Sequence, residues 1–106
     1  RDKMTEEIVH QLQLLRQNIE SLMTQKNSVQ EQLFELDSAI NGLEGSTKSY
    51  KIIGKLLIAK DNIVLQKELS SEKENLELQM SEIETQEKAI QEKMDILQKE
   101  MMAANN

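Results

Sequence analysis

The sequence has no cysteine, no proline and no tryptophan, and its 106 residues include one tyrosine and one phenylalanine. The absence of cysteine excludes disulfides and thiolate metal sites. The shortage of aromatic side chains argues against an ordinary globular core. No apolar run approaches the roughly 20 residues of a membrane span, and no signal segment opens the chain. We therefore expect a soluble cytoplasmic protein, and because Arg1 is not methionine we expect its natural start upstream.

Charged residues are numerous but dispersed. The chain has 13 lysines and arginines against 19 aspartates and glutamates, a net charge of −6. Nucleic-acid binding requires clustered basic side chains that displace counterions, so this balance argues against it. The single histidine, His10, falls at an outward helical position, and there is no glycine-rich phosphate loop, nucleophile elbow or cluster of metal ligands. We expect no enzyme, no cofactor and no bound metal.

A heptad pattern predicts a first helix over about residues 4–43. Its apolar positions alternate in spacings of four and three residues, and all are aliphatic except Lys26. A single polar residue suits a register marker inside a coiled coil, and an accidental substitution is the alternative. Gly42, Gly45 and Ser46 supply residues that end a helix. The seam consists of Ile8, Leu12, Leu15, Ile19, Leu22, Lys26, Val29, Leu33, Leu36, Ile40 and Leu43.

A second helix is predicted over about residues 62–102. Asp61 or Asn62 can cap its first turn by accepting hydrogen bonds from unpaired backbone N–H groups. Its seam is weaker than the first, because methionines and charged residues alternate with the aliphatic positions. The aliphatic positions are Leu69, Leu76, Ile83, Ile90 and Leu97, and the residues between them are Lys73, Met80, Glu87, Met94 and Met101.

The connection between the helices predicts how they meet. Each helix of about 40 residues is about 60 Å long, and some 25 residues separate the two. A connection this short favours antiparallel neighbours within one chain, each covering the seam of the other. In that arrangement Lys26 and Glu87 fall at comparable distances from the connection and meet. The alternative is one continuous parallel dimeric rod, which Gly42, Gly45 and Gly54 disfavour.

An apolar stretch from Tyr50 to Lys60 lies between the helices and fits no heptad. Its β-branched and aliphatic residues predict two short strands at about residues 49–60. Gly54 and Lys55 fit a tight two-residue turn, with glycine at the position that needs a positive φ. The stretch is therefore expected to form a β-hairpin.

Both faces of this hairpin are expected to be apolar, because Ile52 lies opposite Leu57 and Ile53 lies opposite Leu56. Two isolated strands are marginal in water. We expect the chain's own helices to cover one face and neighbouring subunits to cover the other. The residues assigned to subunit assembly are Tyr50, Ile52, Ile53, Leu56, Leu57 and Ile58.

These features resemble the beta-class subunit of prefoldin over most of the chain. The resemblance rests on the heptad arm with its Gly and Ser break, on Tyr50-Lys51-x-x-Gly54-x-Leu56-x-Ile58 before a capped helix, and on Glu74-Asn75-Leu76-Glu77-Leu78 with Gln86-Glu87-Lys88. The alpha class has a longer middle with a second strand pair, for which residues 44–68 leave no room. Residues 1–106 are therefore expected to form one prefoldin-like domain.

The resemblance implies a mostly α fold, with a long antiparallel coiled-coil hairpin and a short β-hairpin that joins an intersubunit β-barrel. It implies a hetero-hexamer with alpha-type and other beta-type subunits. It also implies an ATP-independent chaperone that holds unfolded proteins at the coiled-coil tips and delivers them to a group II chaperonin in the cytoplasm.

Apolar residues gather at the two chain ends, where helices fray and methionine adapts to varied surfaces. A structural coiled-coil tether or spacer subunit, which binds no client, is the alternative, and the strand pair favours the chaperone. The residues assigned to client binding are Met4, Ile8, Val9, Leu12, Ile96, Leu97, Met101 and Met102; all but Met4, Val9, Ile96 and Met102 are seam residues.

Overall fold

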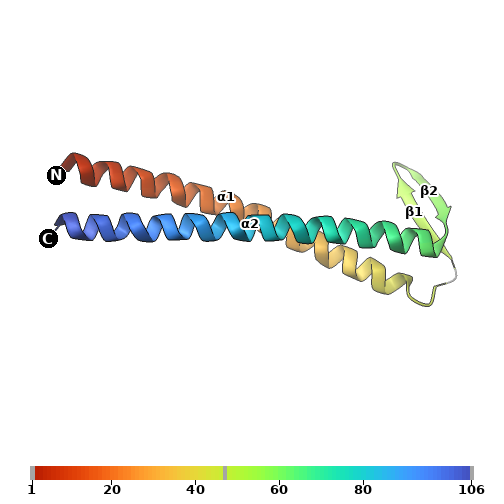
Figure 1. Ribbon diagram of the computed structural model, residues 1–106. Coiled ribbons are helices and arrows are strands. Elements are labelled where there is room, and N and C mark those ends of the chain that lie inside the picture. Colours follow the sequence, from red (N-terminus) through yellow and green to blue (C-terminus); the bar gives the residue numbers. More distant parts are fainter. Residues whose placement is uncertain (1, 47, 106) are drawn as a thin grey trace. The chain divides into compact units, whose positions relative to one another are not determined.

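The computed structural model describes residues 2–46 and 48–105, and Arg1 lies outside them. The elements in chain order are α1 (Asp2–Leu43), β1 (Ser49–Ile53), β2 (Leu56–Lys60) and α2 (Asn62–Asn105) (Figure 1). Two long helices joined by an antiparallel β-hairpin are the predicted fold class, which is confirmed. Within the described ranges, neither helix combines the length and the hydrophobicity needed to cross a membrane.

The chain divides into two compact units. The terminal unit contains the residues up to Asn27 and those from Ser81 onward, so it holds the first part of α1 and the last part of α2. The hairpin unit, Ser28–Met80, holds the remainder of both helices with β1 and β2. Within each unit a segment of α1 packs against an antiparallel segment of α2. This is the arrangement predicted for two antiparallel helices within one chain, and it differs from the alternative of a parallel dimeric rod.

The predicted seams form the apolar core of both units. Every seam residue of α1 and α2 is buried or half-buried, while most of their neighbours along each helix are exposed. In the described part of the chain no large side chain is fully enclosed, so the core is one layer of side chains between two helices. The most buried apolar residues are Ile8, Leu12, Leu22 and Ile83 in the terminal unit and Val29, Leu65 and Leu76 in the hairpin unit. Burying one such side chain contributes about 1.5–3 kcal/mol.

Side chains at the start of α2 satisfy both helix ends that flank the hairpin. Asp61 Oδ1 accepts hydrogen bonds from the backbone N–H of Ile63 at 2.9 Å and of Val64 at 3.3 Å, so Asp61 is the N-cap of α2. The Nδ2 of Asn62 donates to the carbonyl oxygens of Leu43 at 3.0 Å and Ser46 at 2.6 Å. Carbonyl groups at a helix C-terminus lack intrahelical partners, so Asn62 binds the end of α1 to the start of α2.

Two glycines adopt positive φ at the reversals of the chain. Gly45, with φ 76°, lies directly after α1, and the backbone N–H of Ser46 donates to the carbonyl oxygen of Leu43 at 3.1 Å. Gly54, with φ 61°, is the first residue of the two-residue turn between β1 and β2, and Lys55 has no positive φ. This combination fits a type II′ turn, whose twist matches that of the flanking strands. The predicted turn at Gly54 and Lys55 is confirmed.

In each unit a charged seam residue forms an ion pair with a residue of the other helix. In the terminal unit Lys26 Nζ lies 3.5 Å from Glu87 Oε1, and the two side chains are 29% and 27% exposed. This contact between Lys26 and Glu87 is the one predicted from the sequence. In the hairpin unit Lys73 Nζ lies 2.7 Å from Asp37 Oδ1, and this hydrogen bond raises the pKa of Lys73 above its ordinary value. Each pair joins α1 to α2 with complementary charge, so each favours the observed register.

Replacing both Lys26 and Glu87 with leucine is expected to raise the stability of the chain. A well-packed apolar pair commonly equals or exceeds a partly buried ion pair, here by about 1 kcal/mol. For a chain of this size that gain raises the thermal midpoint by about 4–8 °C in a calorimetric scan. Lys26→Leu alone is expected to gain less than the double variant, because it leaves the carboxylate of Glu87 in the seam without its cation.

The matched control is the double variant Gln25→Leu with Gln86→Leu, which adds the same side chains at exposed positions next to the seam. This control should change the midpoint little, because surface substitutions usually alter stability by less than about 0.5 kcal/mol. A seam double variant that melts below the unmodified chain would contradict the interpretation.

Candidate functional site

The two strands present a group of exposed apolar side chains, called here the hairpin surface. The register pairs Ile52 with Leu57 and Ile53 with Leu56, as predicted. These four side chains are between 53% and 72% exposed, although aliphatic residues of this size are usually buried. The hairpin surface consists of Tyr50, Ile52, Ile53, Leu56, Leu57 and Ile58, all of them exposed in the single chain.

The chain's own helices cover only the base of the hairpin, which corrects the expectation that they cover one whole face. Ser49, Lys51 and Ile53 share a face because side chains alternate along a strand. On that face Ser49 is 5% exposed, but Ile53 near the turn is 53% exposed. Both faces therefore leave apolar side chains uncovered, and a large share of the strand surface is free to meet other chains.

A groove of about 310 Å³ lies between β1 and the helices of the hairpin unit. Its wall is mainly apolar, and the outer edge of β1 has no strand beside it among the described residues. An unpaired strand edge next to apolar surface is a template for pairing with another strand. The groove is lined by Ala39, Leu43, Tyr50, Lys51, Ile52, Leu65, Glu68, Leu69 and Glu72.

One carboxylate attaches both strands to α2. Glu68 Oε2 lies 3.2 Å from Lys51 Nζ on β1, and Glu68 Oε1 accepts a hydrogen bond from Lys60 Nζ on β2. These hydrogen bonds, that from Lys60 foremost, hold the pKa of Glu68 below its usual value of 4.5. The three side chains are between 27% and 40% exposed, so solvent screens part of the attraction. The contact fixes geometry more than it adds stability.

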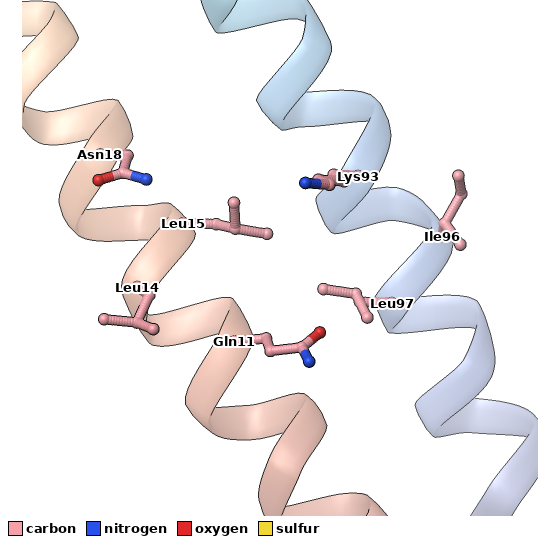
Figure 2. A pocket seen from close by; sticks show the side chains of 7 residues that line it. All are labelled: Gln11, Leu14, Leu15, Asn18, Lys93, Ile96 and Leu97. Atoms are coloured by element: carbon pink, nitrogen blue, oxygen red, sulfur yellow. The ribbon is translucent and has the colours of Figure 1, made fainter.

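A second apolar surface, called here the terminal groove, lies between α1 and α2 in the terminal unit (Figure 2). It is an open groove of about 340 Å³, and Leu15 and Leu97 extend into the space between the helices. Lys93 forms no ion pair with the described residues, so the rim carries a free cation. The groove is lined by Gln11, Leu14, Leu15, Asn18, Lys93, Ile96 and Leu97.

The structure separates the residues assigned to client binding into two groups. Ile8 and Leu12 are each 5% exposed, and Leu97 and Met101 are half-buried, so these four are occupied by the seam. The other four project from the same unit and are exposed, as expected for positions off the seam. They are Met4, Val9, Ile96 and Met102, between 41% and 67% exposed.

Sequence reasoning missed three exposed apolar residues beside these surfaces. Leu14 lies off the seam next to Leu15 and lines the terminal groove. Ile63 and Val64, 65% and 48% exposed, occupy the first turn of α2 directly after β2. These residues could have been found in the sequence, because they are apolar but lie outside the heptad positions. Phe34 and Leu78, also off the seams, are 74% and 61% exposed.

The described residues offer apolar surface rather than clustered polar groups. Nowhere in residues 2–46 and 48–105 do three or more histidine or acidic side chains gather in a way that could hold a metal ion. His10 is exposed, and its side chain forms no hydrogen bond or ion pair with a described residue. What the arrangement offers is apolar surface on two separate units, both accessible to other chains.

Comparison with known proteins identifies the relatives of this sequence. A family model described as "Prefoldin subunit" matches residues 6–106. The sequence is 34% identical over 93 residues to a prefoldin subunit beta of Sulfurisphaera tokodaii, covering 85% of this chain and 74% of the relative. It is 32% identical over 97 residues to a prefoldin subunit beta of Thermococcus onnurineus, covering 89% of this chain and 84% of the relative.

A solved structure is also similar. The crystal structure of the prefoldin beta subunit from Thermococcus strain KS-1 superposes with a TM-score of 0.89 at 27% sequence identity. The match covers 94% of this chain and 90% of the other. The two chains therefore share one fold over most of their length.

The contact between the hairpin and α2 is expected to weaken in acid. Because the pKa of Glu68 is lowered in the folded chain, its ionised form is favoured by folding, and this contribution is complete above the usual value of 4.5. It is lost as the pH falls through the lowered pKa. In NMR titrations from about pH 7 to pH 2, the amide signals of Lys51 and Lys60 should shift below about pH 4.5.

Other charged groups near this contact require a control. Glu72 is a second carboxylate that lines the same groove, so the titration is repeated with Glu68→Gln. In that variant the acid shift at Lys51 and Lys60 should disappear. A shift of unchanged size would mean that another carboxylate, such as Glu72, governs the hairpin.

Proposed function

The chain belongs to the prefoldin family of chaperone subunits, in its beta class, and from this membership we propose that it works as an ATP-independent holding chaperone. In this proposal it assembles with alpha-type and other beta-type prefoldin subunits into a hetero-hexamer, in which the β-hairpins build a shared β-barrel. The complex captures unfolded proteins in the cytoplasm and passes them to a group II chaperonin. The observation that carries the proposal is exposed apolar surface on both units of the chain.

The hairpin surface supports assembly on energetic grounds. Ile52 and Leu57 form a cross-strand pair and are 72% and 65% exposed. Complete burial of one such side chain contributes about 1.5–3 kcal/mol, so several together can offset the entropy lost on association. Strands from other subunits would supply this burial and pair the free edges of β1 and β2.

The terminal unit supports client capture. Met4, Val9, Ile96 and Met102 are exposed, and none of them is required to fill the seam. Methionine is unbranched and polarizable, so it adapts to apolar segments of different shape. Each contact is weak, but several subunits acting on one unfolded chain raise the effective affinity without new contacts. Release to a chaperonin is compatible with contacts of this strength.

Changing Ile52 and Leu57 together to lysine is expected to abolish assembly. Two charges in the hairpin surface would have to be desolvated at the subunit interface, which is strongly unfavourable. The variant is mixed with an alpha-type subunit from the same organism, and the mass of the complex is measured by native mass spectrometry. The helical circular dichroism should be unchanged, because neither residue belongs to a helix.

The matched control for assembly is Leu14→Lys with Met23→Lys, two exposed apolar residues of the terminal unit. This control should give the same hexamer as the unmodified chain. A hexamer of normal mass from the Ile52 and Leu57 variant would exclude the hairpin surface as the site of assembly.

Client capture is tested by replacing Met4, Val9, Ile96 and Met102 with serine in one variant. All four are exposed, so the seam should remain intact while the free apolar surface is lost. Suppression of the light scattering of reduced insulin is then measured for the complex that contains the quadruple variant. We expect this complex to retain less than about a tenth of the suppression given by the unmodified complex. Met102→Ser alone should lose only part of the activity. The chain has no cysteine, so the reductant does not modify it.

The matched control for capture is Phe34→Ser with Leu78→Ser, which removes exposed apolar side chains from the hairpin unit. Full protection by this control and loss in the quadruple variant would assign capture to the terminal unit. If the unmodified complex assembles but does not protect insulin, the structural tether describes the chain better.

A further inference from the structure

The attachment of the hairpin to the helices depends on few contacts. Between described residues, the ion pairs and side-chain hydrogen bonds that join a strand to a helix are those of Glu68 with Lys51 and with Lys60. Apolar packing between the hairpin and the helices is limited to the base of the hairpin. Nearer the turn the apolar residues are all more than half exposed, namely Ile52, Ile53, Leu56 and Leu57. Ser49 at the base is buried, but its hydroxyl has no hydrogen-bond partner among the described residues.

The placement of the two lysines makes Glu68 a bridge between the strands. In the register Ser49 pairs with Lys60 and Lys51 pairs with Ile58, so Lys51 and Lys60 lie on the same face as diagonal neighbours. Diagonal side chains in a hairpin are within about 7–8 Å, where two ammonium groups repel. The carboxylate of Glu68 offsets that repulsion and binds each strand separately. A rotation of the hairpin about its long axis would break at least one of the two contacts.

We infer that Glu68 is a positioning residue for subunit assembly, because it holds β1 and β2 in one orientation on α2 and thereby presents the hairpin surface to partner strands in a fixed direction. The inference rests on the proposed assembly function. A strand can be added to a sheet only if its edge is aligned with the partner, and alignment before contact reduces the entropy lost on binding. Glu68 therefore acts on association more than on the stability of the single chain.

The principal test is Glu68→Gln, which preserves the size of the side chain and removes its charge. Association with an alpha-type subunit from the same organism is measured by analytical ultracentrifugation, and the thermal midpoint of the single chain is measured in parallel. We expect association about tenfold weaker, while the midpoint changes by less than about 2 °C, because exposed ion pairs contribute little to stability. Glu74→Gln is the control, since Glu74 is an exposed glutamate of α2 without an ion pair to the described residues.

A charge-reversed variant distinguishes positioning from a general structural role. Glu68→Lys combined with Lys51→Glu and Lys60→Glu restores both attractions with opposite sign and should recover association to within about threefold of the unmodified chain. The orientation of the hairpin is followed by residual dipolar couplings of the β1 and β2 amides. These couplings should change in Glu68→Gln and return in the reversed variant.

The outcomes separate the inference from the function on which it rests. If the unmodified chain assembles and Glu68→Gln assembles equally well, the positioning role is overturned and the proposed assembly stands. If Glu68→Gln loses association only in proportion to a lowered thermal midpoint, the residue is structural and the inference is also overturned. If the unmodified chain does not associate with the alpha-type subunit, the proposed function itself is wrong.

Discussion

A single layer of aliphatic side chains between α1 and α2 is the interaction on which the rest of the structure depends. The chain has no disulfide, almost no aromatic residues and no fully enclosed large side chain among those described. Each unit is therefore held by seam residues such as Leu12 and Leu76, each of which meets the opposite helix. Because this core is thin, the apolar side chains off the seam stay exposed, and these are the residues available for other chains.

The charged residues within and beside this layer have roles that differ with position. Two ion pairs connect α1 to α2, Lys26 with Glu87 and Lys73 with Asp37. They favour the observed register of the two helices over shifted registers. Glu68 instead connects a helix to both strands of the hairpin. Half-exposed pairs of this kind contribute little net free energy, so their effect lies in selecting one geometry among several of similar stability.

Most of the fold could be predicted because its determinants are local or periodic. Every residue that the heptad spacing assigned to a seam is buried or half-buried, although the spacing did not include the buried Leu65. Gly54 identified the turn, and equal distances from the connection predicted the pairing of Lys26 with Glu87. The role of Asn62 could not be predicted, because its amide binds the carbonyl groups of Leu43 at the end of α1 and of Ser46 after it, 19 and 16 residues away in sequence. The bridging role of Glu68 was missed for the same reason. It depends on how the hairpin folds back on α2, which no periodicity encodes.

The placement of Tyr50 has a spectroscopic consequence. It is the single tyrosine of a chain without tryptophan, so emission excited near the tyrosine absorption maximum comes from one residue of β1. That ring is 51% exposed, and any chain that covers β1 changes its polarity and its access to a quencher such as iodide. The long helices contribute no comparable signal. The intrinsic fluorescence of this protein is therefore a local and label-free probe of the hairpin.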